Sequence, residues 1–283
     1  MADREDPSAV RWLVGVELTR FRERVGKKIT EAAKVINCSA GKVGHMESGR
    51  NQQQPAEVRD LLRFYRADQA DIDRLSSLAG SAGQQTWWAP WTDVVPDWLR
   101  TFVGLEGLAS RSSIYAPLVL PALLQTEAYA LGVTAGNLRV RPDHDERTVS
   151  LRMERQRRLF DEEHPLRLAV MLEEVVLDRP IGGAGIMRAQ LERLVELGQR
   201  DNVELRILPT ALGAHDALVG PFTVLDFAEA QSIGYAEMVN GAVYVQDQAQ
   251  VAGYTRIVHR LREVALSPEQ TADLIRTRLT ALT

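Results

Sequence analysis

Apolar side chains recur at helical spacing through the first eighty residues of the chain. Val10, Val14, Leu18, Phe21 and Val25 form the stripe of a first helix, and Gly26 ends it. Capping residues and apolar periodicity predict four more helices: about 30–36, about 40–47 after the N-cap Ser39, one that begins at Pro55 and one that opens at Asp68. These elements predict a compact five-helix unit that ends near residue 80.

The pattern changes after residues 80–86, which are rich in glycine, serine and glutamine and read as a linker. Val203, Leu205 and Ile207 alternate with charged residues, as in a half-buried strand. Asn240-Gly241, between two apolar runs, is a strong hairpin signal. The remaining pattern predicts strands at about 114–119, 203–207, 222–227, 233–239 and 242–246, and helices at about 97–111, 123–132, 143–160, 249–264 and from Ser267 onward.

The chain therefore divides into two parts of different class. We predict an all-α, five-helix domain at residues 1–80, a linker at 81–90 and an α+β domain at 91–283. The second domain would contain a mixed or antiparallel sheet of four or more strands. The whole chain is thus predicted to be α+β.

Composition narrows the class of protein. The chain has 283 residues, 45% hydrophobic and 25% charged, which is typical of a globular protein and excludes disorder of the whole chain. The longest apolar run, residues 116–124, is far shorter than the ~20 residues of a membrane helix. The first six residues are mostly charged and no apolar signal segment follows, so we expect a cytoplasmic protein without a membrane partner. The single cysteine, Cys38, excludes an internal disulfide, and a structural role in a turn is favoured over a redox switch.

The distribution of charge is uneven. The net charge is −4, yet residues 11–66 carry 12 basic and 6 acidic side chains, so the rest of the chain is strongly acidic. All the lysines lie within this basic stretch, at Lys27, Lys28, Lys34 and Lys42. A local basic cluster of this kind is what contact with phosphates requires.

The order of elements in the basic stretch is specific. A helix, a tight turn at Asn37-Cys38, a serine-capped helix and a Glu-x-Gly stop, followed by two more helices, fit a helix-turn-helix. Over about residues 12–66 the sequence resembles the Cro/cI-repressor-like family, also called the xenobiotic-response-element family. The matching residues are Leu18, Phe21, Arg22, Gly26, Ala33, Ile36, Ser39, Val43 and Glu47-Ser48-Gly49-Arg50. The resemblance implies a DNA-binding, repressor-like protein.

In such a fold the helix at 40–47 lies in the major groove of DNA. The resemblance implies base contacts at Ala40, Gly41 and His45 and a backbone contact near Lys42. Ala40 and Gly41 have no hydrogen-bonding side chains, so His45 and Lys42 would carry most direct readout, and DNA shape or a partner would supply the rest. Ile29 stands where many relatives have glutamine. The candidate DNA-binding residues are Lys27, Lys28, Ile29, Thr30, Lys34, Ser39, Ala40, Gly41, Lys42, His45 and Arg50. The alternative is a three-helix packing unit that binds no DNA.

The chain from Trp87 onward is similar to the uncharacterised C-terminal domain that is fused to such helix-turn-helix units in actinobacterial regulators. The matching stretches include Trp87-Trp88, Gly104-Leu105-Glu106, Leu120-Pro121-Ala122-Leu123-Leu124-Gln125-Thr126, Arg155-Gln156, Glu173-Glu174, Gly213-Ala214-His215 and Gly220-Pro221-Phe222. Ala122 departs from the pattern, because relatives mostly have glycine after the proline. The resemblance implies regulation of development or secondary metabolism and a small acidic partner protein encoded by an adjacent gene.

Several residues of this second part are candidates for binding a ligand or partner. Arg152 and Arg155 share a helix face, and arginine suits carboxylates, phosphates or an acidic protein surface, although a solvated helix face balanced by nearby acidic residues is favoured. Trp87 and Trp88 belong to a cluster of four tryptophans that could line a pocket, but packing at an interdomain hinge is favoured. Gln125 follows Pro121 and would either face a pocket or, like Thr126, cap a helix.

The sequence contains no strong signature of catalysis. The five histidines form no i, i+4 pair, and there is no Gly-x-Ser-x-Gly elbow. The glycine-rich residues 182–185 lack a phosphate-binding motif and read as a loop before a helix. Glu173-Glu174 and His215-Asp216 would form an acid–base group only if they met in space, and core or capping roles are favoured. We expect no enzyme activity, no cofactor and no metal.

These patterns together predict a sequence-specific transcription regulator that binds double-stranded DNA as a homodimer. Its C-terminal domain would sense a ligand or bind the small acidic partner. The alternative is a protein-interaction module of a toxin–antitoxin-like pair, in which DNA binding serves autoregulation.

Overall fold

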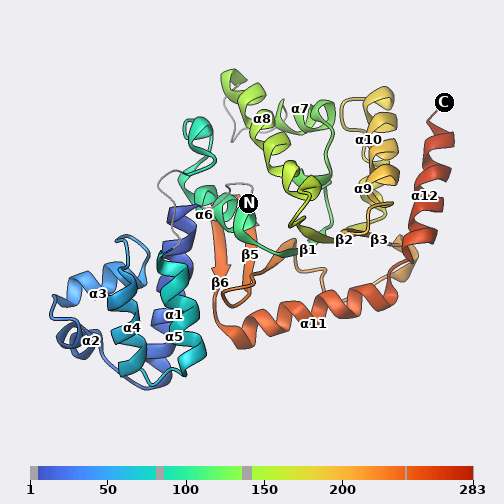
Figure 1. Cartoon of the computed structure of the whole chain (residues 1–283). Coiled ribbons are helices and arrows are strands. Elements are labelled where there is room, and N and C mark those ends of the chain that lie inside the picture. Colours follow the sequence, from blue (N-terminus) through green and yellow to red (C-terminus); the bar gives the residue numbers. More distant parts are fainter. Residues whose placement is uncertain (1–5, 81–85, 136–141, 240, 283) are drawn as a thin grey trace.

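The computed structural model describes residues 6–80, 86–135, 142–239 and 241–282, and its first part consists of helices (Figure 1). The five helices are α1 (Pro7–Arg24), α2 (Ile29–Val35), α3 (Ala40–Glu47), α4 (Pro55–Phe64) and α5 (Gln69–Gly80). Their bounds confirm the five helices predicted from the sequence. Fifteen buried side chains, among them Phe21, Met46 and Tyr65, form their common core.

Local chemistry explains where these helices begin and end. The Ser39 hydroxyl accepts a hydrogen bond from the Lys42 N–H at 3.1 Å, so it caps α3 as predicted. Gly49 ends the same helix with a φ of 70°, a left-handed conformation that glycine adopts at low cost. Asn37 takes a similar conformation, with a φ of 49°, in the turn between α2 and α3.

A mixed sheet forms the centre of the second part, in the order β3-β2-β1-β4-β5-β6. Its strands are β1 (Arg111–Ala116), β2 (Arg167–Glu173), β3 (Val203–Leu208), β4 (Phe222–Asp226), β5 (Ile233–Met238) and β6 (Gly241–Val245). β1, β2 and β3 are parallel, and β4, β5 and β6 extend the sheet by antiparallel pairs. The fold is therefore α+β, as predicted, and the sheet is mixed.

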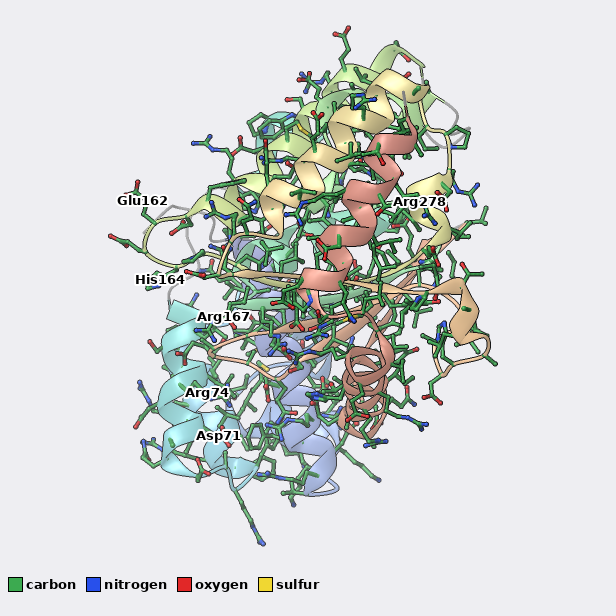
Figure 2. The ribbon with its side chains drawn as sticks, turned by 90° about the vertical axis from the view of Figure 1, so that its right-hand side faces the viewer. Asp71, Arg74, Glu162, His164, Arg167 and Arg278 are labelled. Carbon is green, nitrogen blue, oxygen red and sulfur yellow. The ribbon has the colours of Figure 1, made fainter. Side chains whose placement is uncertain are left out.

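Helices cover both faces of this sheet (Figure 1). The second part contains α6 (Asp97–Leu108), α7 (Glu127–Ala135), α8 (Asp145–Gln156), α9 (Val175–Asp178), α10 (Ala184–Leu197), α11 (Gln248–Val264) and α12 (Pro268–Ala281). α11 lies below the sheet in the figure, and α7, α8, α10 and α12 lie on the other side. Val251, Val258 and Leu261 of α11 join the core of one face, while Leu191 of α10 and Ile275 of α12 join that of the other. Arg278 of α12, labelled in Figure 2, pairs with Glu174 at 2.7 Å and Asp178 at 2.8 Å.

Some predicted elements were wrong in extent. The helix expected at 123–132 is a 3-10 turn at Ala122–Leu124 followed by α7, because Gln125 is extended and the Thr126 hydroxyl caps α7 through the Tyr129 N–H. The helix expected at 143–160 is α8, flanked by 3-10 turns at Pro142–His144 and Arg157–Phe160. β2 was not predicted: it is a central parallel strand, buried on both faces, so its residues do not alternate. The hairpin between β5 and β6 is present, with Met238 opposite Gly241; Asn240 lies outside the described residues.

α1 belongs to both parts of the molecule. Ala9 and Leu13 lie in the core on one face of the sheet, whereas Val10 and Val14 lie in the core of the five-helix unit. Residues 81–85 of the expected linker lie outside the described residues, and Trp88 of the same linker is buried. α1 therefore connects the two parts by direct packing.

Candidate DNA interface and ligand cavity

α3 presents small and polar groups on its outer side. Gly41 and His45 are exposed, and Ala40 and Gly44 are half-buried. On the inner side, Val43 and Met46 are completely buried, which fixes the helix against the core. This is the orientation that the sequence predicted for a helix that enters the major groove.

Two of the four lysines that were predicted to bind DNA form ion pairs with acidic neighbours. Lys42 forms an ion pair with Glu57 of α4, and this hydrogen bond raises the pKa of Lys42. Lys27 pairs with Glu31 at 2.9 Å, while the Lys28 backbone N–H donates to the same carboxylate and holds the pKa of Glu31 below its usual value. Lys28 and Lys34 are exposed, and the described residues place no carboxylate within ion-pair distance of either ammonium. They are therefore the lysines best placed to take a phosphate.

The remaining predicted residues of this face have mixed roles. Thr30 and Arg50 are exposed, so both are accessible to DNA. Ile29 is half-buried against the five-helix core, and Ser39 acts as the cap of α3. Cys38 is half-buried at the edge of the same core, which agrees with a structural role in the turn.

An ion pair joins α1 to the end of α3. The Arg22 guanidinium donates two hydrogen bonds to the Glu47 carboxylate, at 2.6 and 2.9 Å, and both side chains are largely buried. This contact raises the pKa of Arg22. Glu47 belongs to the Glu-x-Gly stop, so its role is to fix α3 against α1, which sequence reasoning did not assign.

A close backbone approach lies beside this ion pair. A Cβ atom at Gly15 of α1 would stand only 2.4 Å from the Glu47 carbonyl oxygen and 2.7 Å from that of Met46. One at Gly49 would stand 2.8 Å from the Cα of Trp12. The same turns of α1 therefore touch the C-terminal end of α3 directly.

A cavity of about 1080 Å³ lies in the second part, between α6, α8, the sheet and the segment after β1. Its walls are mainly apolar and include Val95, Leu99, Phe102, Leu123 and Leu151. Trp98 also lines it, and Leu118 and Met238 are exposed residues of the lining. Its size matches the ligand sites of small-molecule binding proteins.

Arg155, one of the predicted binding residues, is buried in this wall with its charge satisfied. Its guanidinium donates to both Glu106 oxygens, at 2.7 and 2.9 Å, and lies 5.6 Å from the centre of the Phe102 ring. Burial disfavours the charged form, but the Glu106 carboxylate outweighs it and raises the pKa of Arg155. Arg155 is therefore unavailable to an acidic protein surface, and the expected exposed arginine face does not exist here.

Arg152 lines the same cavity with neutral partners only. Its guanidinium donates to the Gln125 side-chain oxygen at 3.2 Å and to the Ala130 carbonyl at 3.4 Å. Within the described parts of the chain, no carboxylate lies at ion-pair distance from it. Burial, reinforced by the neighbouring Arg155 charge and opposed in part by the Glu237 charge, lowers the pKa of Arg152 to about 10, so the side chain remains a cation at neutral pH. Gln125 is buried, and its amide also donates to the Leu120 carbonyl at 2.7 Å.

The predicted tryptophan residues serve packing instead. Trp88 is buried with Val95, Val103 and Leu151, and its indole N–H donates to Asp6, the N-cap of α1. Trp87 packs at the edge of this cluster, and neither residue belongs to the cavity lining. The favoured interpretation as packing where the two parts meet agrees with this arrangement. Trp98, another of the four clustered tryptophans, does line the cavity.

The structure also brings together Glu173 and His215, which the sequence suggested only as a weak acid–base pair. The His215 Nε2 and the Tyr115 hydroxyl both lie 2.8 Å from the same Glu173 oxygen. The Ala217 N–H donates to the His215 Nδ1 at 3.3 Å. This group ties the loop after β3 to the ends of β1 and β2.

The arrangement of α2 and α3 defines a helix-turn-helix unit joined to an α+β body, and comparison with known families agrees. Residues 13–75 match the family model described as a helix-turn-helix domain. Residues 99–277 match the model described as Domain of unknown function (DUF5753). The chain therefore belongs to the DUF5753 family and carries a helix-turn-helix domain at its N-terminal side. No curated protein and no solved structure matches the chain. Among the described residues, no helix is both long and apolar enough to cross a membrane.

Proposed function

We propose that the protein is a sequence-specific transcription regulator that places α3 in the major groove of double-stranded DNA. The observation that carries this proposal is the helix-turn-helix domain, with α3 turned so that Gly41 and His45 are exposed. The neighbouring cations Lys28, Lys34 and Arg50 would contact phosphates. His45 is the main candidate for direct base readout, because Ala40 and Gly41 offer no hydrogen-bonding groups.

A homodimer is the second element of the proposal. Dimeric helix-turn-helix proteins read two half-sites about 34 Å apart, or a multiple of that spacing. α3 has eight residues, two of them glycines, so a single copy would hold DNA weakly.

The α+β part would be the control element. It contains a large apolar cavity, and α1 packs against both this part and α3. The control signal would be a small ligand in the cavity or a small acidic protein from an adjacent gene, in a cytoplasmic setting. Enzyme activity is not part of the proposal, and Glu173 and His215 are assigned to holding the loop after β3.

A direct test is retention of sheared genomic DNA by the full-length protein at low salt, followed by sequencing of the retained fragments. We expect one enriched motif with two-fold symmetry. If no fragment is retained, either by the protein alone or after co-expression with the products of adjacent genes, the proposal is wrong.

The alternative, an interaction module of a toxin–antitoxin-like pair, predicts a different phenotype. Expression of one gene of the pair alone would arrest growth, and co-expression of its neighbour would relieve the arrest. A regulator without such a pair gives no growth arrest in the same assay.

A further inference from the structure

We propose that the cavity in the α+β part binds a small amphipathic organic anion, whose acidic group pairs with Arg152 and whose apolar body fills the space between α6, α8 and β5. This inference names the ligand class for the control element of the proposed function. Binding of this anion does not involve α3. The ligand proposal and the DNA-binding proposal can therefore each be wrong while the other is right.

The pattern of ion pairs around the cavity, rather than its net charge, points to Arg152 as the site of an anion. Arg155 and Glu106 neutralise one another through two hydrogen bonds. Arg100 pairs with Asp97 at 2.8 Å, and Asp93 pairs with Arg147 at 2.7 Å.

Arg152 differs from these cations because its two acceptors are an amide oxygen and a backbone carbonyl. Glu237 also lines the cavity, and its charge favours the cationic form of Arg152, but within the described residues these two side chains do not form an ion pair with one another. Arg152 is half-buried, and a cation that is largely removed from water without an ion-paired carboxylate is costly, so a bound anion would lower that cost.

A neighbouring hydroxyl could complete the anion site. Thr148 lies one helical turn before Arg152 on α8, and both side chains line the cavity. The Thr148 Oγ1 is buried and has no hydrogen-bond partner among the described residues. Such buried hydroxyls are almost always hydrogen-bonded, so a ligand oxygen is a reasonable acceptor for it.

The rest of the cavity suits an apolar body of considerable size. Its volume of about 1080 Å³ exceeds what a simple carboxylate such as acetate needs. Leu99, Phe102 and Leu151 supply apolar walls, and Leu118 and Met238 add apolar side chains that are 58% and 54% exposed. An inorganic anion would leave these surfaces in contact with water, whereas an amphipathic acid would cover them.

A matched pair of fluorescent probes tests the inference. 1-Anilinonaphthalene-8-sulfonate is an amphipathic anion, and N-phenyl-1-naphthylamine has the same aromatic body without the sulfonate. Both would be titrated into the full-length protein without DNA. The variants would be Arg152→Met, which removes the charge, Arg152→Lys, which keeps it, and Arg157→Met, which removes an exposed arginine just after α8.

We expect R152M to weaken binding of the sulfonate at least tenfold and to change binding of the neutral amine less than twofold. R152K should retain most of the affinity for the sulfonate, and R157M should behave as the wild type. Equal binding of the sulfonate by wild type and R152M, or equal losses for both probes, would overturn the proposal.

Thermal unfolding would show whether each variant is folded. Should R152M unfold, Arg152→Gln takes its place, since glutamine can still donate to the Ala130 carbonyl, and the same two outcomes decide. Neither outcome of the probe titrations changes whether the wild type retains genomic DNA. A negative probe result is therefore distinguishable from a negative result for the proposed DNA-binding function.

Discussion

Gly15 and Gly44 have opposite surroundings, although both lie within helices of the DNA-binding unit. A Cβ at Gly15 would collide with backbone carbonyls of α3, whereas one at Gly44 would meet nothing within 4 Å. Backbone atoms cannot move aside as a side chain can, so Gly15 is required for the approach of α1 to α3. Gly44 has no such constraint and only weakens its helix.

Gly15→Ala should therefore destabilise the fold by about 2 kcal/mol or more, because α1 must move away from α3. Gly44→Ala is the matched control and should stabilise it by up to about 1 kcal/mol, through helix propensity alone. Chemical denaturation of the two variants would measure both effects. A stable G15A variant would contradict the close packing described for these helices.

The Arg22–Glu47 ion pair belongs to the same junction. Glu47→Ala leaves a largely buried guanidinium without its carboxylate and should lower the free energy of unfolding by about 2–3 kcal/mol. Asp60→Ala is the control, because Asp60 and Arg63 are exposed and 3.7 Å apart; it should cost less than about 0.5 kcal/mol. Similar values from urea titrations of the two variants would contradict the role assigned to Glu47.

Local residue chemistry was predictable from the sequence, and distant partners were not. Ser39 and Ser267 each accept a hydrogen bond from the backbone N–H three residues later. Their capping roles could therefore be inferred from the adjacent sequence. Glu106 and Arg155 are separated by 49 positions, and nothing near either residue indicates the other. The same separation explains why Arg155 was expected on a surface.

At the scale of elements, alternation revealed β3 but not β2. β3 lies at one edge of the sheet, and its burial alternates over most of its length. β2 lies between β1 and β3, which are parallel to it, and both of its faces are covered. Its sequence is therefore a continuous apolar run, which fits a buried helix as well as a buried strand. The cavity could not be predicted for a related reason: it depends on how α6, α8 and β5 pack, not on any one segment.

Glu204 of β3 connects this edge strand to α11. Burial alone would raise its pKa, but hydrogen bonds and charges from Arg206 and Arg262 outweigh burial and lower the pKa below 4.5. A carboxyl whose pKa is lowered on folding stabilises the fold above its unfolded pKa, and this contribution is lost as the pH falls through its folded pKa.

Glu204→Gln should therefore lower the melting temperature at pH 7, and its difference from wild type should shrink as the pH falls below about 4.5. Glu162→Gln is the control, since Glu162 is exposed on the loop after the Arg157–Phe160 turn (Figure 2). Calorimetry at several pH values would measure the melting temperatures of both variants and of the wild type. A difference for E204Q that stays constant down to pH 3 would contradict the assignment.

At the scale of the whole molecule, aromatic rings connect α1 with the cavity. The Trp12 ring lies 5.5 Å from that of Tyr244, which lies 5.3 Å from that of Tyr235. Tyr235 stacks on Phe102 at 4.1 Å, and both of these residues line the cavity. A separate contact between the five-helix unit and the α+β part is the hydrogen bond that Arg74 of α5 donates to the Glu229 carbonyl; Figure 2 shows Arg74 beside Asp71. A ligand that moves Phe102 or Tyr235 would therefore act on α1 and, through it, on α3.

Trp12→Leu should separate ligand binding from DNA binding. We expect it to bind the anionic probe within twofold of wild type, because Trp12 does not line the cavity. In wild type the probe should change DNA affinity by about fivefold or more, and in W12L this effect should disappear. Fluorescence anisotropy with and without the probe measures both quantities. The same response in W12L as in wild type would remove the ring series from the mechanism.

The measurement that tests the central claim most directly is genomic DNA selection by three full-length proteins: wild type, a Lys34→Ala, His45→Ala double variant, and Arg157→Met as the control. Both substituted positions of the double variant are exposed on α2 and α3, so the fold should persist. The account predicts one two-fold motif enriched by wild type and R157M and lost by the double variant. Equal enrichment by all three proteins would show that α3 is not the reader. No enrichment by wild type, either alone or after co-expression with the products of adjacent genes, would show that the protein does not select DNA.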